Sequence, residues 1–182
     1  LCEAWRFIPP VVLSSVYPLL VKKRQENYES YQRKLQSVYD LLMLMGLAVA
    51  AAGVLAGPYL LRLVYGAKYQ DAIPVFLILV CTAPFAFSGS VRGQQFLIEN
   101  LNIYHIWSAL IGIAVNLGLA LYLMPRLGAA GAAVASLVGY AVSVYLTSWM
   151  FPRLRACAVA QSKSLLAPFR LRGLFLAVTN RA

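Results

Sequence analysis

The sequence is short of charged side chains and of the residues that most catalytic and metal sites require. Of its 182 residues, 12% are charged, six are acidic and one is a histidine. The single histidine excludes a His-rich metal site, and three widely spaced cysteines (Cys2, Cys81 and Cys157) exclude a disulfide framework or a metal cluster. No Gly-rich dinucleotide loop, P-loop, HExxH motif or Ser/His/Asp set is present. We therefore expect a protein that is not an enzyme and that uses no metal or cofactor.

Apolar side chains are present in excess. The chain is 61% hydrophobic and its mean hydropathy is +0.71. Soluble domains are about half apolar and about a quarter charged. Because a chain this poor in charge cannot cover a soluble core with polar surface, lipid is the natural solvent for the excess. The composition predicts an all-α fold, a polytopic transmembrane helix bundle.

The apolar residues fall into segments close to the length that crosses the hydrocarbon core. We expect about five spans, near residues 4–21, 38–61, 72–91, 103–124 and 129–151, followed by a basic cytoplasmic tail at 152–182. Between the first two spans the charge spacing, with Glu29 four residues before Arg33, predicts a short helix that runs into the second span. The tail is either an interfacial amphipathic segment or a disordered basic tail.

Prolines and small residues add detail to these spans. Three prolines in the first span predict a kinked or discontinuous helix, and Pro84 should kink the third. Pro125 and Pro152 should end the fourth and fifth helices. Small residues recur every four positions in both of these helices, which predicts a closely packed antiparallel hairpin. They are Ser108, Gly112, Asn116 and Ala120 in the fourth span, and Gly131, Ala135, Gly139 and Ser143 in the fifth.

Basic residues account for a net charge of +10 and gather beside apolar segments. Because five spans alternate sides, the loops 22–37 and 92–102 share one side with the tail. That side holds twelve basic residues and the other holds three, with Arg6 uncounted near or within the first span. The twelve are Lys22, Lys23, Arg24, Arg33, Lys34, Arg92 and six in the tail, and the three are Arg62, Lys68 and Arg126. The asymmetry predicts a cytoplasmic C-terminus. Nucleic acid is disfavoured as a partner, because its binding domains spread basic residues over one folded face.

Three stretches of sequence carry a family resemblance. The first span ends VLSSVYPLLVKK, and the turn after the second reads LRLVYGAKYQDAIPVFLIL. The stretch that leads into and through the fourth and fifth spans reads GQQFLIENLNIYHIWSALIGIAVNLGLALYLMPRLGAAGAAVASLVGY. In this order and spacing, over roughly residues 1–151, they resemble the C-terminal half of the polysaccharide (O-antigen-type) flippases of the multidrug/oligosaccharidyl-lipid/polysaccharide superfamily. Leu127 stands where the family often has an aromatic residue, and Ser136 where a threonine is common.

The resemblance implies a transporter that flips an undecaprenyl-pyrophosphate-linked oligosaccharide across the inner (plasma) membrane for polysaccharide biosynthesis, such as the O-antigen of lipopolysaccharide. The first span here would correspond to the eighth of about twelve, so we expect a C-terminal fragment that forms the second lobe of a two-lobe transporter. Its partners would be the lipid-linked oligosaccharide, membrane lipids and the missing N-terminal half of the same transporter. One lobe would rock against the other around a polar cavity.

Polar side chains in or beside the spans are the candidates for a substrate path, because a pyrophosphate headgroup needs inward-facing polar or cationic groups. Arg6 and Glu3 either line that path or reach the membrane interface. Arg92 and Glu99 are expected in the cytoplasmic loop 92–102, where they either meet the pyrophosphate or anchor the loop. Asn116, in the middle of the fourth span, either binds substrate or makes an interhelical hydrogen bond.

Other functions fit parts of the pattern. Within the same superfamily they are a peptidoglycan-precursor flippase, which commonly has two further spans that do not fit after residue 152, and a small-molecule exporter. A membrane-embedded glycan-processing enzyme would need a large outer loop or a paired acid/base set, whereas the outer loops near 62–71 and 125–128 are short. The proline-kinked spans disfavour a purely structural subunit.

Overall fold

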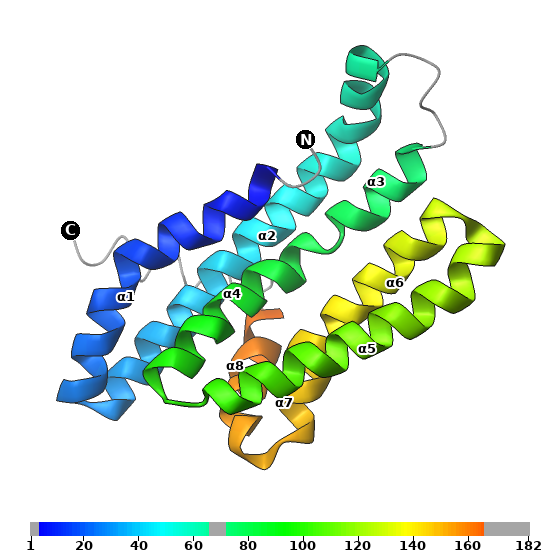
Figure 1. Ribbon diagram of the computed structural model, residues 1–182. Coiled ribbons are helices and arrows are strands. Elements are labelled where there is room, and N and C mark those ends of the chain that lie inside the picture. The colour runs from blue at the N-terminus through cyan, green and yellow to red at the C-terminus, as the bar shows by residue number, and fades with distance from the viewer. Residues whose placement is uncertain (1–3, 66–71, 166–182) are drawn as a thin grey trace.

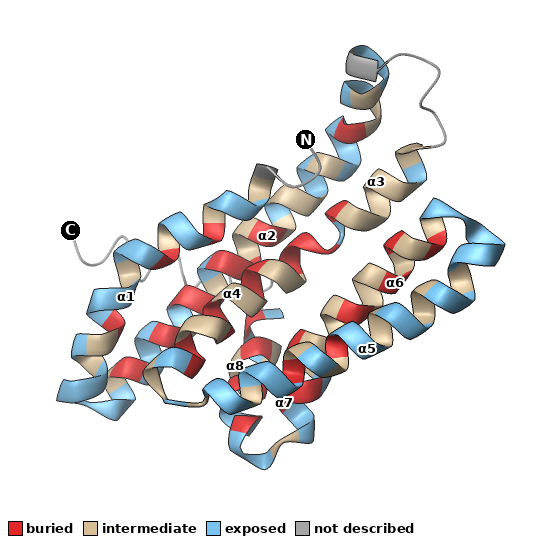
Figure 2. Ribbon diagram, in the orientation of Figure 1, coloured by how far each residue is buried: buried red, intermediate tan, exposed pale blue. Residues whose placement is uncertain are grey.

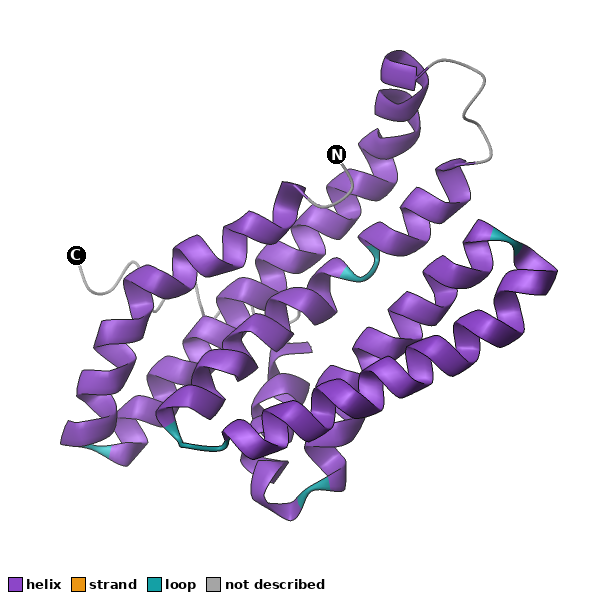
Figure 3. Ribbon diagram, viewed as in Figure 1, coloured by secondary structure: helices purple, strands orange, loops and turns teal. Residues whose placement is uncertain are grey.

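The computed structural model describes residues 4–65 and 72–165, which are built from helices (Figures 1 and 3). In chain order they are η1 (Ala4–Phe7, a 3-10 turn), α1 (Ile8–Glu26), α2 (Tyr28–Tyr65), α3 (Ala72–Val80), α4 (Ala83–Ile98), α5 (Asn102–Leu127), α6 (Ala129–Ala141), η3 (Val142–Leu146, a π-helical segment), α7 (Thr147–Met150), η4 (Pro152–Leu154, a 3-10 turn) and α8 (Arg155–Leu165). No strand occurs within these residues, and the predicted all-α fold is confirmed.

Four stretches of the described chain are long and apolar enough to cross a membrane. They are Tyr28–Leu63, Ala72–Ile98, Asn102–Leu127 and Ala129–Met150, with mean hydropathies between 1.7 and 2.1. The prediction of a multi-pass membrane bundle is confirmed by these four stretches. The first expected span differs from them. Residues 4–21 form η1 and most of α1, a 19-residue helix whose last five residues are the polar run Lys22–Glu26.

The prolines act differently in the first and third predicted spans. The first is helical without a break from Ala4 to Glu26: Pro9 and Pro10 occupy the first turn of α1, directly after the 3-10 turn η1, and Pro18 lies inside α1, so the span is not discontinuous. The third span is interrupted at Cys81 and Thr82, which separate α3 from α4. Pro84 lies in the first turn of α4, where a missing N–H costs little, so the break comes just before the proline rather than at it.

Of the two helix ends predicted from prolines in the last two spans, one agrees with the structure and one does not. The prediction that Pro125 ends α5 was wrong. The helix runs on to Leu127, because a proline in the final turn removes only one hydrogen bond. It ends at Gly128, whose φ of 59° favours glycine and whose N–H bonds Met124 O at 2.9 Å. The fifth helix does stop at Pro152, after a π-helical interruption that the sequence did not predict.

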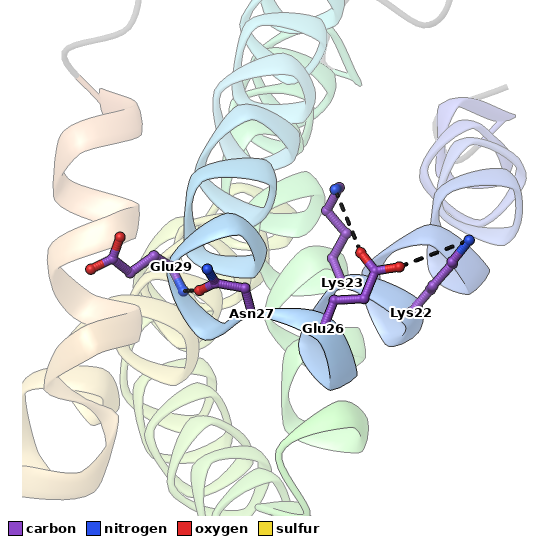
Figure 4. A network of polar contacts seen from close by, with 5 residues as sticks. All are labelled: Lys22, Lys23, Glu26, Asn27 and Glu29. Atoms are coloured by element: carbon purple, nitrogen blue, oxygen red, sulfur yellow. Dashed lines mark hydrogen bonds and ion pairs between the residues drawn. The ribbon is translucent and has the colours of Figure 1, made fainter.

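The polar stretch after α1 is helical on both sides of a single extended residue. Asn27 separates α1 from α2, and its side-chain Oδ1 accepts a hydrogen bond of 2.9 Å from the N–H of Glu29, which caps the start of α2 (Figure 4). Ion pairs support both helix ends: Lys22 and Lys23 each approach Glu26, and Glu29 pairs with Arg33 at 3.7 Å. The predicted helix that runs into the second span is therefore confirmed, although α2 begins at residue 28 rather than 38.

The predicted close packing of the last two spans is confirmed by the backbone approach of α5 and α6. A Cβ atom on Gly112 would lie 2.5 Å from Ser143 Cβ and 3.2 Å from Gly139 O. A Cβ on Gly139 would lie 2.8 Å from Asn116 Cβ. Because only glycine leaves room for these contacts, the small residues bring the two helices together. A similar contact joins α2 to α4, where a Cβ on Gly46 would lie 2.8 Å from Pro84 Cα.

Buried apolar side chains gather where α1, α2 and α4 meet, whereas much of α5 is exposed (Figure 2). Leu20, Tyr39, Leu42 and Phe87 at that junction are fully buried. The large apolar residues that remain exposed are what lipid-facing helices require. On α5 they include Ile103, Ile106, Trp107, Leu110, Ile113, Leu117 and Leu121.

The first part of the predicted tail forms the helix α8, which packs against α2. Its buried side is made by Cys157, Ala158, Gln161 and Ser164. Gln36 of α2 donates a 3.1 Å hydrogen bond to the carbonyl of Ala160. Of the two alternatives for the tail, the structure favours an ordered helix for residues 155–165. Residues 166–182 lie outside the described part of the chain.

Candidate functional site

The main cavity has a volume of about 460 Å³ and lies between η1 with the start of α1, α4, α5 and the α6–η3 segment. Small residues on one side of α4 create the space: Gly89 and Gly93 are four residues apart, with Ser90 beside them. A Cβ on Gly89 would touch Val144 Cγ2 at 3.0 Å. The lining consists of Trp5, Arg6, Pro9, Ala86, Gly89, Ser90, Arg92, Gly93, His105, Tyr140, Ser143 and Val144.

Arg6 of η1 lines this cavity and contacts Tyr140 of α6, another of its lining residues. Its Nη2 donates a 2.7 Å hydrogen bond to the hydroxyl of Tyr140. The guanidinium carbon is 5.5 Å from the centre of the Tyr140 ring and 5.7 Å from the centre of the Trp5 ring, within range of cation–π attraction. Arg6 is exposed.

Arg92 is buried among helices, and its predicted place in a cytoplasmic loop was wrong. Helix α4 continues to Ile98, and Arg92 is only 2% exposed. Its Nη1 donates hydrogen bonds to Val144 O at 2.9 Å and to the hydroxyls of Thr147 at 3.0 Å and Ser148 at 2.8 Å. The polar run after residue 91 suggested a loop, whereas its polar side chains turn inward to partners on α2, η3 and α7.

The described lining of this cavity is basic. Both Arg6 and Arg92 line it, and none of the lining residues that the structure describes is acidic. All three hydrogen bonds of Arg92 come from Nη1, and within the described residues no carboxylate forms an ion pair with it. The positive charge of Arg92 is therefore largely uncompensated by its neutral hydrogen-bond partners. An anion that enters the cavity would be attracted strongly to this charge. No three His, Cys, Asp or Glu side chains of the described chain gather as metal ligands.

Two further hollows adjoin the main cavity and share lining residues with it. One, of about 240 Å³, lies between α5 and α6, shares Tyr140 and Ser143, and is also lined by Asn116. The other, of about 340 Å³, lies beside α1 and shares Ser90 and His105. We call these three adjoining spaces the groove; the two arginines line the main cavity, which shares residues with both of the others.

Of the five residues predicted for the substrate path, three lie in this groove. Arg6 and Arg92 line the main cavity, and Asn116 lines the hollow beside it. Glu99 is not part of the lining of these three spaces: its Oε1 accepts hydrogen bonds from the Tyr31 hydroxyl at 3.1 Å and from Gln95 Nε2 at 3.0 Å. This arrangement matches the anchoring alternative for Glu99. Glu3 lies outside the described residues.

Several lining residues were missed from the sequence. Tyr140, Trp5 and His105 looked like ordinary aromatic residues of apolar segments, and only the packing of the helices brings them together. One signal was present in the sequence: the small residues Ala86, Gly89 and Gly93 fall on one side of a helix, in the same kind of pattern that marked α5 and α6.

Comparisons of the chain with models of known protein families, with curated proteins and with solved structures found no match. The functional proposal therefore depends on the chemistry of the groove.

Proposed function

We propose that this chain is part of a membrane transporter that moves an undecaprenyl-pyrophosphate-linked oligosaccharide across the inner membrane for polysaccharide biosynthesis. The observation that carries the proposal is a cavity of about 460 Å³ in a bundle of membrane-spanning length, whose described lining includes Arg6 and Arg92 and no acidic residue. A pyrophosphate group cannot cross lipid unaided, because removing its charges from water costs far more than thermal energy supplies. Cationic groups inside the bundle lower that cost.

The two arginines suit the phosphates of such a headgroup. A guanidinium presents a planar fork of N–H donors that matches phosphate oxygens. The three hydrogen bonds that Arg92 donates to the described chain come from Nη1, and the exposed Arg6 lines the same cavity. We infer that the pyrophosphate lies between them while the prenyl chain stays in the lipid beside α5, whose exposed side is apolar. Movement of this lobe against the other half of the transporter would expose the groove alternately to each side.

The distribution of charge supports an orientation with the C-terminus in the cytoplasm. At the end of the bundle that holds the α1–α2 junction and α8, the described residues include eight basic side chains, and at the opposite end two (Figure 1). The eight are Lys22, Lys23, Arg24, Arg33, Lys34, Arg153, Arg155 and Lys163, and the two are Arg62 and Arg126. Arg92 was counted with the cytoplasmic loops in the sequence, but it lies within α4. Without it the basic residues on that side still outnumber those on the opposite side.

Deleting the gene tests the proposal. The deletion strain should accumulate lipid-linked glycan on the cytoplasmic leaflet and lose surface glycan, and the full-length protein should restore export. Full-length protein with Arg6→Ala should reach the membrane at wild-type levels without restoring export. Arg126→Ala, which removes an exposed arginine stacked on Tyr122 far from the groove, is the matched control and should restore it.

Different outcomes of this experiment separate the alternatives. Normal surface glycan in the deletion strain would contradict the proposal. Accumulation of a peptidoglycan precursor would assign the chain to the neighbouring flippase family, which carries the same pyrophosphate-linked lipid. Full export by Arg6→Ala would remove Arg6 from the substrate path. The groove favours transport over glycan processing, because its described lining contains no pair of carboxylates for acid/base catalysis.

A further inference from the structure

The hollow between α5 and α6 differs in chemistry from the arginine cavity beside it. Its volume is about 240 Å³, many times the space of a single water molecule. The backbones of Gly112 and Gly139 bring the two helices close along its edge, and Asn116, Tyr140 and Ser143 supply its polar groups. None of its described lining residues is charged. A second phosphate is therefore not the ligand that it suits.

The polar groups of this hollow offer both donors and acceptors. The hydroxyl of Ser143 donates to Ser108 O at 3.1 Å, which leaves its oxygen able to accept. The hydroxyl of Tyr140 accepts from Arg6, which leaves its proton able to donate. The amide of Asn116 has no hydrogen-bond partner within the described part of the chain and offers both kinds of group. A neutral ring with hydroxyl or acetamido substituents matches this set.

We propose that this hollow binds the sugar residue bonded directly to the pyrophosphate, a neutral hexose or N-acetylhexosamine, and that Asn116 hydrogen-bonds one of its substituents. The proposal rests on the proposed function. The two spaces share Tyr140 and Ser143, so a pyrophosphate held by the arginines places its first sugar at the opening of the hollow. A mid-span amide is costly in lipid unless it is satisfied, and a sugar hydroxyl satisfies it.

Binding to the full-length protein in detergent micelles tests this assignment with two probes, farnesyl pyrophosphate and the same lipid carrying one N-acetylglucosamine. Isothermal titration calorimetry should show the sugar-bearing probe binding about tenfold more tightly, as expected for one or two additional neutral hydrogen bonds. Asn116→Leu, which keeps the branched shape of the side chain and removes the amide, should abolish that advantage and leave the affinity for farnesyl pyrophosphate within about twofold of wild type. Leu55→Ala, at an exposed apolar position of α2 that lines none of the three spaces, is the control and should change neither affinity.

The outcomes distinguish this proposal from the proposed function. If farnesyl pyrophosphate does not bind, the proposed function fails and the sugar site fails with it. If it binds and the sugar adds no affinity, or Asn116→Leu keeps the full advantage, the sugar site is overturned while the proposed function stands. Thermal melting checks that the variant is folded. If Asn116→Leu does not fold, Asn116→Ser replaces it, and an undiminished advantage in that variant overturns the sugar site equally.

Discussion

Arg92 shows most clearly what single residues contribute. A nearly buried guanidinium is costly, and its three hydrogen bonds go to neutral groups of η3 and α7 rather than to a carboxylate. Those acceptors do not depend on it. Ser148 Oγ donates to Val144 O at 2.8 Å, and Thr147 Oγ1 donates to Ser143 O. Since the bundle does not need Arg92 to satisfy these groups, the charge is better explained by the cavity that it lines.

Replacing Arg92 with methionine separates a functional role from a structural one. We expect Arg92→Met to melt within about 3 °C of wild type, because lost hydrogen bonds and the relief of a buried charge offset each other. Glycan export should be lost. Arg92→Lys keeps the charge but lacks the planar fork, so export should fall without being abolished. Melting curves and an export assay on the full-length variants test this. Failure of Arg92→Met to fold would make Arg92 a structural anchor, and normal export would remove it from the path.

Some residues of the groove could be identified from the sequence and others could not, for physical reasons. Arg6 and Asn116 stand out as polar residues in apolar segments, and both line the groove. Arg92 was predicted in a loop, because a run of polar residues looks the same whether it faces water or other helices. The positions of Tyr140 and Trp5 opposite Arg6 depend on how three segments pack, and no spacing in the sequence encodes that packing.

Among the elements, the α5–α6 hairpin was the most predictable and the helix boundaries the least. Small residues every four positions predicted the close contact at Gly112 and Gly139, because backbone approach in lipid has few other solutions. The long helix α2 begins ten residues before the predicted span, since the Asn27 cap and local ion pairs keep its polar start helical. The π-helical segment η3 has no local sequence signal.

Gly112 provides a direct test of the hairpin. A Cβ there would meet Ser143 Cβ at 2.5 Å, an atom that cannot move without the backbone, so Gly112→Ala should destabilise the protein by about 1–3 kcal/mol. Gly118, two turns along the same helix, has no atom within 4 Å of an added Cβ. Gly118→Ala is the matched control and should be neutral or slightly stabilising. Equal melting temperatures of the two variants in detergent would contradict the packing described for α5 and α6.

At the scale of the whole molecule, the composition predicted the class of fold and the charge pattern predicted its orientation. Four apolar stretches of membrane-spanning length confirm the first. The orientation remains a prediction, and a native cysteine is a poor probe of it. Cys157 is only 1% exposed, and burial raises the pKa of its thiol to about 12, so it resists thiol reagents from either side.

Two introduced cysteines give a sharper test of orientation, in a background of Cys2→Ser and Cys81→Ala. Arg126→Cys lies at the exposed α5–α6 turn, and Lys163→Cys lies on the exposed side of α8. A thiol reagent that cannot cross the membrane should label Arg126→Cys in intact cells and Lys163→Cys only after permeabilisation. The reverse pattern would invert the orientation, and labelling of both in intact cells would contradict an odd number of spans between residue 126 and the C-terminal helix.

The central claim is that the arginine-lined groove carries a pyrophosphate-linked glycan across the bilayer, and transport in proteoliposomes tests it most directly. The full-length protein is reconstituted with an undecaprenyl-pyrophosphate-linked glycan that ends in N-acetylglucosamine, and an external galactosyltransferase labels only the glycan in the outer leaflet. We predict that vesicles with the wild-type protein become labelled completely. Vesicles that contain the Arg6→Ala/Arg92→Met variant should be labelled only to the level of protein-free vesicles. Equal labelling with and without the wild-type protein would contradict the account.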